Sequence, residues 1–160
     1  MTEIRYEPIG TIHTPFRDRA NVPIQTIGGV GIKGTIDIKP EYERCLKDLQ
    51  EFSHIILIYH FHLSKGYSPE VKPFMDDQLR GVFSTRAPKR PNPIGFSVVR
   101  LVKIVGRTLH IEDLDIVDGT PLLDIKPYIP KIDAHMVERL GWAENKVERF
   151  PNVKADSRFD

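Results

Sequence analysis

The sequence contains one cysteine and no long hydrophobic run, and each absence excludes a class of protein. Cys45 alone cannot form an intramolecular disulfide, and it offers no cluster of thiolates for a metal. No apolar segment approaches the roughly 20 residues that a membrane-spanning helix needs. The first seven residues include two glutamates and no hydrophobic segment of a secretory signal, so we expect a cytoplasmic protein.

Three common catalytic motifs are absent as well: the G-x-S-x-G elbow, the H-E-x-x-H helix and the Walker A loop. Hydrolysis by the usual nucleophiles therefore has no support. A G-x-G-x-x-G string does occur at Gly29–Gly34, but dinucleotide binding requires a strand before it and a helix after it. Here a polar loop precedes the string and an alternating segment follows, so we predict that these glycines mark bends or close backbone approach.

The 160 residues are enough for one domain with its own hydrophobic core. Alternation of apolar and polar residues predicts a series of short strands. The predicted strands cover residues 3–14, 32–38, 52–63, 80–85, 95–105, 108–116 and 122–126. We therefore predict a mainly-β fold, a single compact barrel of about six to seven strands with one early helix and a short C-terminal helix or tail.

Two helices complete this prediction. Pro40 and Glu41 are suited to the first turn of a helix, and Tyr42, Cys45, Leu46 and Leu49 then follow helical spacing, which predicts Cys45 in the core. A second, short helix is predicted at residues 134–144. We expect a barrel domain at residues 1–135 and a C-terminal helix or tail at residues 136–160, packed on the barrel or extending from it.

Positive charge is concentrated in one stretch. Residues 78–111 contain seven Lys or Arg and no Asp or Glu, so the remainder of this chain of net charge +1 carries −6. Pro88, Pro91 and Pro93 stiffen the loop that presents Arg86 and the two following basic residues. A stiff basic loop loses little entropy around an anion, which indicates a phosphate or nucleic-acid site. The alternative is a solvated face whose acidic partners come from elsewhere in the fold.

His54, His60 and His62 share one face of a predicted strand. A metal site would need a further ligand with suitable spacing, and none follows, so we expect no metal. His62 lies near the strand end and is better placed to contact a ligand. The Asp118-Gly119-Thr120 turn has two readings: a plain turn, or a carboxylate and hydroxyl that hold ribose hydroxyls or an amino group.

Three segments of the chain resemble a known family. They are Phe83-Ser-Thr-Arg-Ala-Pro-Lys-Arg-Pro-Asn-Pro-Ile-Gly95, Leu114-Asp-Ile-Val-Asp-Gly-Thr-Pro121 and Asp124-Ile-Lys-Pro-Tyr128. With Ile9–Phe16 and Phe52–His54, they are similar to the TsaA-like or TrmO family, also called YaeB or VirR, over roughly residues 5–130. The resemblance implies a homodimeric β-barrel that binds S-adenosylmethionine. It also implies methylation of N6 of threonylcarbamoyladenosine at position 37 of tRNA.

The resemblance also implies site residues. By motif, the S-adenosylmethionine contacts would be Pro23, Ile24, Gln25, His62, Leu63, Arg86, Phe96, Asp118, Gly119, Thr120 and Pro121. The candidate catalytic residues are Arg86, Arg90 and His62. The candidate contacts to tRNA phosphates are Lys89, Arg90, Arg100, Lys103 and Arg107. The family often has a basic residue where Ile24 stands and a glutamine where Leu63 stands, so we expect backbone contacts at these two positions.

Some alternatives stay open from the sequence. The general base is a choice between His62, Asp118 and Tyr59. The chain could also be a non-catalytic regulatory module that binds S-adenosylmethionine or a nucleoside. A third alternative is an RNA-binding barrel without a cofactor, which rests on the basic stretch alone.

Overall fold

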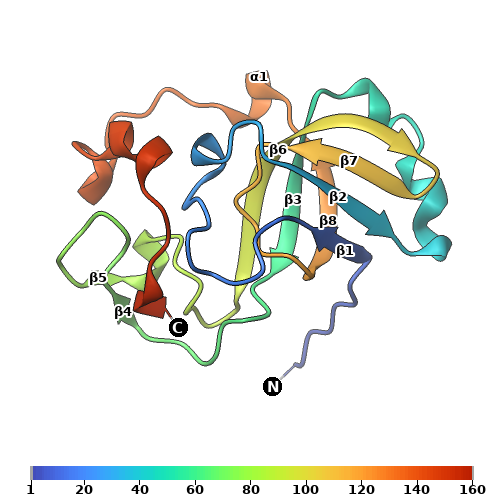
Figure 1. The fold of residues 1–160 in the computed structure, drawn as a ribbon. Coiled ribbons are helices and arrows are strands. Elements are labelled where there is room, and N and C mark those ends of the chain that lie inside the picture. Colours follow the sequence, from blue (N-terminus) through green and yellow to red (C-terminus); the bar gives the residue numbers. More distant parts are fainter. Residues whose placement is uncertain (1, 160) are drawn as a thin grey trace.

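Six antiparallel strands form a closed barrel in the computed structural model, which describes residues 2–159 (Figure 1). Around the barrel the order is β1-β2-β7-β6-β3-β8, and β8 pairs again with β1. The strands are β1 Gly10–His13, β2 Lys33–Ile38, β3 His54–His60, β6 Ile94–Val105, β7 Thr108–Glu112 and β8 Thr120–Pro127. The predicted mainly-β barrel is therefore confirmed.

Alternation along the strands builds the core, because neighbouring side chains point to opposite faces of a sheet. In β3, Ile55, Leu57 and Tyr59 are buried, while the residues between them are only partly covered. The same pattern in the other strands fills the barrel interior with aliphatic side chains. The central members are Ile12, Ile36, Ile38, Val99, Leu109, Ile111 and Leu122.

Glycines allow close contacts where the rejected dinucleotide string occurs. A Cβ atom on Gly29 would clash with the Leu114 carbonyl, and one on Gly34 would clash with the His13 carbonyl and the Leu114 side chain. Gly31 has a φ of +81°, which only glycine adopts without strain. Gly34 lies within β2 and no helix follows it, so the prediction that these glycines mark bends and close approach is confirmed.

Four secondary-structure predictions need correction. Residues 3–14 contribute only β1, and residues 2–7 are exposed. Residues 80–85 do not join the barrel: β5 Arg80–Gly81 pairs with β4 Glu70–Val71, and a 3₁₀ turn at Val82–Ser84 follows. β7 ends at Glu112 rather than at residue 116, and Asp113 then has a φ of 70°. The fourth correction concerns the helices.

The early helix is a short 3₁₀ helix, Pro40–Leu46, followed by another at Leu49–Glu51. Between them Asp48 turns the chain with a φ of 67°, so only Tyr42, Leu46 and Leu49 pack on the barrel core. The prediction of Cys45 in the core is wrong, because this residue is exposed on so short a helix.

The predicted helix at 134–144 is also wrong. Helix α1 is a single turn, Pro130–Asp133, and the chain is extended from Ala134. Residues 131–140 are all exposed, so no packing surface stabilises a helix there. Short 3₁₀ helices follow at Gly141–Ala143, Val147–Asn152 and Ser157–Phe159. No helix within residues 2–159 is long and apolar enough to cross a bilayer.

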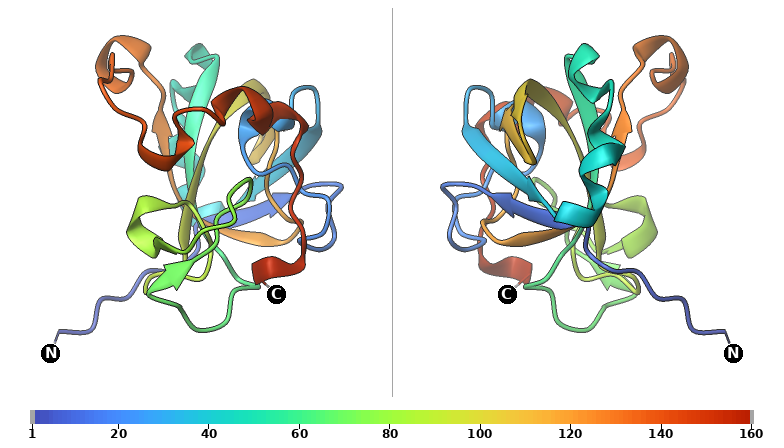
Figure 2. Two further views of the ribbon diagram at one scale, coloured as in Figure 1. Left: turned by 90° about the vertical axis from the view of Figure 1, so that its left-hand side faces the viewer. Right: turned by 90° about the vertical axis from the view of Figure 1, so that its right-hand side faces the viewer.

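The last part of the chain lies against one side of the molecule. We call residues 141–159 the C-terminal strap, which runs in orange to red along the side where β4 and β5 lie (Figures 1 and 2). Lys154 forms a bridge with Pro23, and Ala155 donates its backbone N–H to the Val22 carbonyl. Phe159 is buried against Val71, Val82 and Ala87. The β6–β7 hairpin projects on the opposite side (Figure 1).

Candidate active site

A cavity of about 800 Å³ lies between the barrel and the C-terminal strap. This volume is within the range of cavities that hold cofactors and drug-sized ligands. The barrel side is formed by parts of residues 22–27, 59–64, 83–90, 94–96 and 115–120. The strap adds Trp142, Ala143, Val147, Phe150, Ala155, Asp156 and Phe159. Segments from both ends of the sequence therefore enclose one site.

The basic loop forms one wall of the cavity and is stabilised from within. Arg90 donates from Nη1 to the carbonyl oxygens of Thr85 and Ala87, both at 3.0 Å. Thr85 Oγ1 in turn accepts the N–H of Ala87, and Ser64 donates to the Pro88 carbonyl at 3.0 Å. The guanidinium of Arg90 therefore holds the shape of the loop, which keeps neighbouring Arg86 in place.

Arg86 contacts two other predicted cofactor residues, Gln25 and Phe96. Its Nη1 donates to Gln25 Oε1 at 2.5 Å, and its guanidinium carbon lies 4.8 Å from the centroid of the Phe96 ring. Phe96 belongs to β6, whereas Gln25 belongs to the loop after β1. Next to Phe96, a Cβ atom on Gly95 would come within 2.6 Å of the Tyr59 and Phe61 rings. Glycine at this position lets both rings reach the cavity.

A hydrogen-bonded chain of two buried hydroxyl groups and one partly buried carboxylate also reaches the cavity. The Ser97 hydroxyl donates to Asp115 Oδ1 at 2.6 Å and lies 2.8 Å from the Tyr59 hydroxyl. Burial raises the pKa of Asp115 to about 6, although the Ser97 hydrogen bond and the charge of Arg86 act in the opposite direction. Burial, with the nearby Asp115 charge, raises the pKa of Tyr59 well above its usual value. Tyr59 therefore stays protonated at neutral pH.

The other predicted cofactor residues divide into two groups. Pro23, Ile24, His62, Leu63 and Thr120 line the cavity. Burial, followed by the effect of His60, lowers the pKa of His62, so its ring is neutral at physiological pH. Asp118, Gly119 and Pro121 are not in the cavity wall.

The Asp118 carboxylate has contacts of its own. Its Oδ1 accepts the backbone N–H of Thr14 at 3.0 Å and lies 3.5 Å from His13 Nδ1. Gly119 has a φ of 80° and donates its N–H to the Ile12 carbonyl. These contacts fasten the turn before β8 to the end of β1.

The predicted tRNA contacts are split between the two ends of β6. Arg90 lines the cavity and Lys89 lies in the same loop, whereas Arg100, Lys103 and Arg107 follow along β6 and its hairpin. Nine residues at about 3.3 Å each place Lys103 on the order of 30 Å along the strand from Ile94. Arg100 lies directly opposite Glu112 of β7. Arg107 donates to the Ile38 carbonyl at 2.6 Å.

Sequence reasoning missed two parts of the site. Asp115 was one of two alternating acids, and no signal distinguished it from Asp113, which instead accepts the backbone N–H of Gly31 outside the cavity. The strap was missed because its residues lack periodicity. The unique tryptophan, Trp142, was the one available signal, since a large aromatic side chain in a polar tail is unusual.

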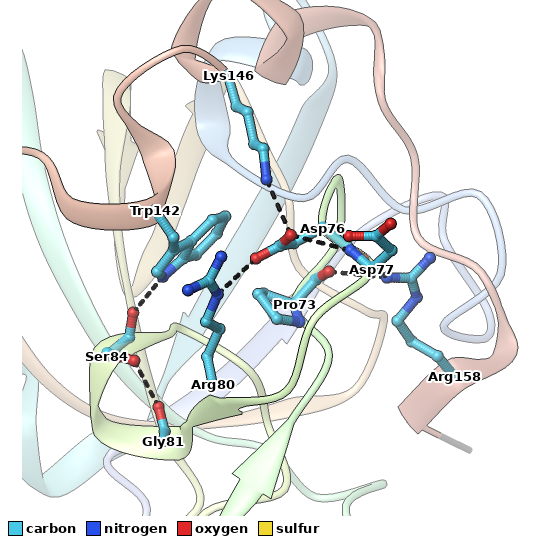
Figure 3. A network of polar contacts seen from close by, with 9 residues as sticks. All are labelled: Pro73, Asp76, Asp77, Arg80, Gly81, Ser84, Trp142, Lys146 and Arg158. Carbon is cyan, nitrogen blue, oxygen red and sulfur yellow. Dashed lines mark hydrogen bonds and ion pairs between the residues drawn. The ribbon is translucent and has the colours of Figure 1, made fainter.

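Polar contacts hold the strap over the cavity (Figure 3). The Asp76 carboxylate, only 2% exposed, accepts Arg80 Nε at 2.7 Å and Lys146 Nζ at 2.9 Å. Trp142 Nε1 donates to the Ser84 carbonyl at 2.7 Å, and Arg158 donates to the Pro73 carbonyl at 2.8 Å. Hydrogen bonds from Arg80 and Lys146 hold the pKa of Asp76 far below its usual value. Asp76 is therefore ionised and anchors the strap.

Residues 11–134 match the family described as the tRNA-methyltransferase O N-terminal domain. The chain belongs to the TrmO family. It is 53% identical over 156 residues to a probable S-adenosyl-L-methionine-binding protein of Pyrococcus abyssi, covering 98% of this chain and 85% of that protein. It is 36% identical over 140 residues to the tRNA (adenine(37)-N6)-methyltransferase of Escherichia coli, covering 81% of this chain.

A solved structure is similar too. The crystal structure of TrmO from Pseudomonas aeruginosa aligns with a TM-score of 0.75 and 35% identity over 89% of this chain. The TrmO-family chain spans 64% of that structure and 60% of the Escherichia coli enzyme. Within residues 2–159, no group of three or more His, Cys, Asp or Glu side chains could hold a metal ion.

Proposed function

We propose that this TrmO-family protein is an S-adenosylmethionine-dependent methyltransferase that acts on N6 of adenosine 37 in the tRNA anticodon loop, where that nitrogen carries a threonylcarbamoyl group. The observation that carries this proposal is the cavity, which combines Arg86, aromatic walls and the partly buried Asp115 carboxylate at the basic loop of a chain that belongs to a methyltransferase family. The work would take place in the cytoplasm, where tRNA is found.

The residues of the cavity fit the cofactor. Phe96, Phe61 and Ile24 offer apolar surface for an adenine ring, and the Asp115 carboxylate favours a cation nearby. Gln25 and backbone groups of residues 23–25 and 62–63 offer polar contacts for the ribose and amino-acid portions. When bound, S-adenosylmethionine supplies an electrophilic methyl group on a positively charged sulfur.

The protein's own contribution would be positioning and charge. An N6 nitrogen next to a carbonyl is a weak nucleophile until its proton leaves, and negative charge then spreads over the carbamoyl group. Arg86, already oriented by Gln25 and Phe96, is suited to stabilise that charge. Arg90 would support catalysis by fixing the loop, through its bonds to the Thr85 and Ala87 carbonyls.

The proposal includes two further assignments, the contacts to tRNA and the oligomeric state. Lys89, Arg90, Arg100, Lys103 and Arg107 would contact tRNA phosphates, with the pocket end nearest the anticodon loop. The protein would act as a homodimer, which the family resemblance implies. Both the position of the tRNA and the dimer can be tested separately from catalysis.

The decisive experiment is incubation with methyl-labelled S-adenosylmethionine and bulk tRNA that carries threonylcarbamoyladenosine but lacks its N6-methyl group. The tRNA is then digested to nucleosides. We expect label in N6-methyl-N6-threonylcarbamoyladenosine and none in tRNA that lacks the threonylcarbamoyl group. Label in plain N6-methyladenosine would contradict the proposed acceptor. If no nucleoside carries label while calorimetry shows intact cofactor binding, the proposed methyltransferase activity is contradicted.

One observation favours a second function. The chain spans only 60% of the Escherichia coli tRNA enzyme but 85% of the Pyrococcus abyssi relative, which is named as a binding protein. A non-catalytic module that binds S-adenosylmethionine would show the calorimetric signal without transfer. Absence of any calorimetric signal would leave an RNA-binding barrel.

A further inference from the structure

Asp115 occupies a position where a carboxylate is unfavourable for folding. Its neighbours Leu114 and Ile116 are 0% and 2% exposed, and its own carboxyl group lines the cavity. Its pKa of about 6 in the folded protein lies above the value near 4 of an unfolded chain. A raised folded pKa means that the ionised carboxylate opposes folding once the pH exceeds the unfolded value. A group retained in this way is a candidate for function.

The polar chain gives this carboxylate a defined orientation. Ser97, 3% exposed, uses its one proton to donate to Asp115 Oδ1. The Tyr59 hydroxyl, 2.8 Å from Ser97 Oγ, must then be the donor to that oxygen. Tyr59 therefore donates to Ser97 and Ser97 donates to Asp115, so the carboxylate is the final acceptor of this hydrogen-bond chain. Ser97 engages one carboxylate oxygen.

The surrounding charges suit a proton acceptor. Among the charged and titratable groups, Arg86 of the basic loop acts on the Asp115 pKa, and the Asp115 charge in turn acts on Tyr59 of β3. The others that line the same cavity are Arg19, His62, Arg90 and Asp156. The charge of Arg86 lowers the Asp115 pKa, and both residues line the same cavity, where Arg86 would also stabilise negative charge on a bound acceptor. An acid with a pKa near 6 is mostly ionised at physiological pH and still basic enough to take a proton.

We propose that Asp115 is the general base of the methyl transfer, with Ser97 and Tyr59 as its positioning residues. The inference rests on the proposed function. His62 is the competing candidate, but within residues 2–159 its pKa responds to burial and to His60, and no hydrogen bond orients its ring. Asp115 has the orienting partners that a catalytic base needs.

In the proposed step, loss of the N6 proton accompanies transfer of the methyl group. The N6–H bond of the acceptor breaks and its proton passes to the Asp115 carboxylate, while the nitrogen keeps the electron pair. A new N–CH₃ bond forms as the S–CH₃ bond breaks, and the electron pair of that bond stays on sulfur as a neutral thioether. Asp115 ends protonated and releases its proton to solvent when the products leave.

The test compares Asp115→Asn with Asp113→Asn. The two changes are chemically identical and two residues apart, but the Asp113 carboxylate binds Gly31 N–H outside the cavity. Single-turnover methylation of tRNA is measured from about pH 5 to 9, with affinity for S-adenosylhomocysteine by calorimetry and thermal melting of the free protein. Wild-type protein is assayed in parallel.

For wild type and Asp113→Asn we expect the rate to rise with pH and level off above an apparent pKa at or below about 6, because a bound cation lowers the pKa of a carboxyl. Asp115→Asn is expected to be slower by roughly 10²- to 10⁴-fold at about pH 8 and to lose this pH dependence. Its affinity for S-adenosylhomocysteine is expected to stay within about threefold, and its melting temperature at or above that of wild type.

Ser97→Ala gives an independent readout that keeps the carboxylate. The Ser97 hydrogen bond lowers the Asp115 pKa, so its loss is expected to move the rising part of the rate profile to higher pH. A profile that does not move, or an Asp115→Asn rate within about threefold of wild type, overturns the inference. A loss of S-adenosylhomocysteine binding in Asp115→Asn also overturns it, because the carboxylate then serves binding. Failure of wild type to methylate overturns the proposed function as well.

Discussion

The two ends of β6 carry the same kind of charge in different surroundings. At the Ile94 end, Arg90 is held by carbonyls of its own loop, and Arg86 is held by Gln25 from the loop after β1 and by Phe96 of β6, beside a cavity. At the other end, Lys103 is exposed and Arg107 closes a hairpin turn. Strand geometry turns a compact basic stretch of sequence into two distant groups. A count of charges therefore indicates a partner, whereas a position in the wall of a cavity indicates where chemistry takes place.

Of the variants that test the difference between the two ends of β6, Arg86→Ala is expected to have the largest effect. Arg86 is exposed, donates a hydrogen bond to Gln25 and stacks on Phe96, so we expect little change in melting temperature. Loss of a preorganised charge at the reacting group is expected to lower single-turnover methylation by at least about 100-fold. Arg86→Lys keeps the charge but not the planar group, and we expect an intermediate rate. Wild-type turnover in Arg86→Ala would remove the distinction between the two ends.

A second change tests whether the strap belongs to the cavity end. Asp76→Asn weakens the contacts to Arg80 and Lys146, so we expect a lower melting temperature and several-fold weaker binding of S-adenosylhomocysteine by calorimetry. Because the folded pKa of Asp76 is depressed, its stabilisation is present above the unfolded value near 4 and is lost as the pH falls below it. The melting difference from wild type should therefore shrink as the pH is lowered through about 4.

Asp77→Asn is the matched control, since this adjacent carboxylate is exposed. We expect it to leave melting and affinity close to wild type. Equal effects of the two variants, or a melting difference for Asp76→Asn that is constant with pH, would show that this ion pair does not anchor the strap.

The smallest expected effect concerns the far end of β6. If Lys103 contacts a tRNA phosphate, Lys103→Ala should weaken tRNA binding several-fold and reduce the dependence of log affinity on log salt by about one. Single-turnover methylation at saturating tRNA should be unchanged. Val102→Ala shortens the neighbouring side chain, which is 50% exposed, without changing charge. An unchanged salt dependence in Lys103→Ala would assign the tRNA surface to the cavity end alone.

Local patterns were sufficient where neighbours in sequence decide the structure. Alternation predicted most barrel strands, as in Ile55, Leu57 and Tyr59, because a strand buried on one face leaves that signature. The same reasoning failed for Cys45 and for residues 134–144. Whether a helix forms there depends on what it packs against, and helical spacing alone does not supply a partner surface.

Several site residues were predictable from motifs, and the structure brings Pro23, Gln25, His62, Arg86 and Phe96 to one cavity. Asp115 was not predictable, because residues two apart share one face of a strand, so alternation alone does not separate it from Asp113. Trp142 and Lys146 could not be predicted as site residues for a different reason. Their partners, Ser84 and Asp76, are more than 50 residues away, and no local pattern encodes such a pairing.

The amino-acid sequence by itself determined the barrel class, the TrmO family and the stiff basic loop, since each depends on the order of residues over short distances. Only the tertiary structure decided which charges surround the cavity and that Arg90 braces the loop. It also decided that the partly buried Asp115 carboxylate lines the same cavity as Arg86. The physical reason is that closure of the barrel and of the strap sets burial, and burial controls both the reach of a charge and the pKa of an acid.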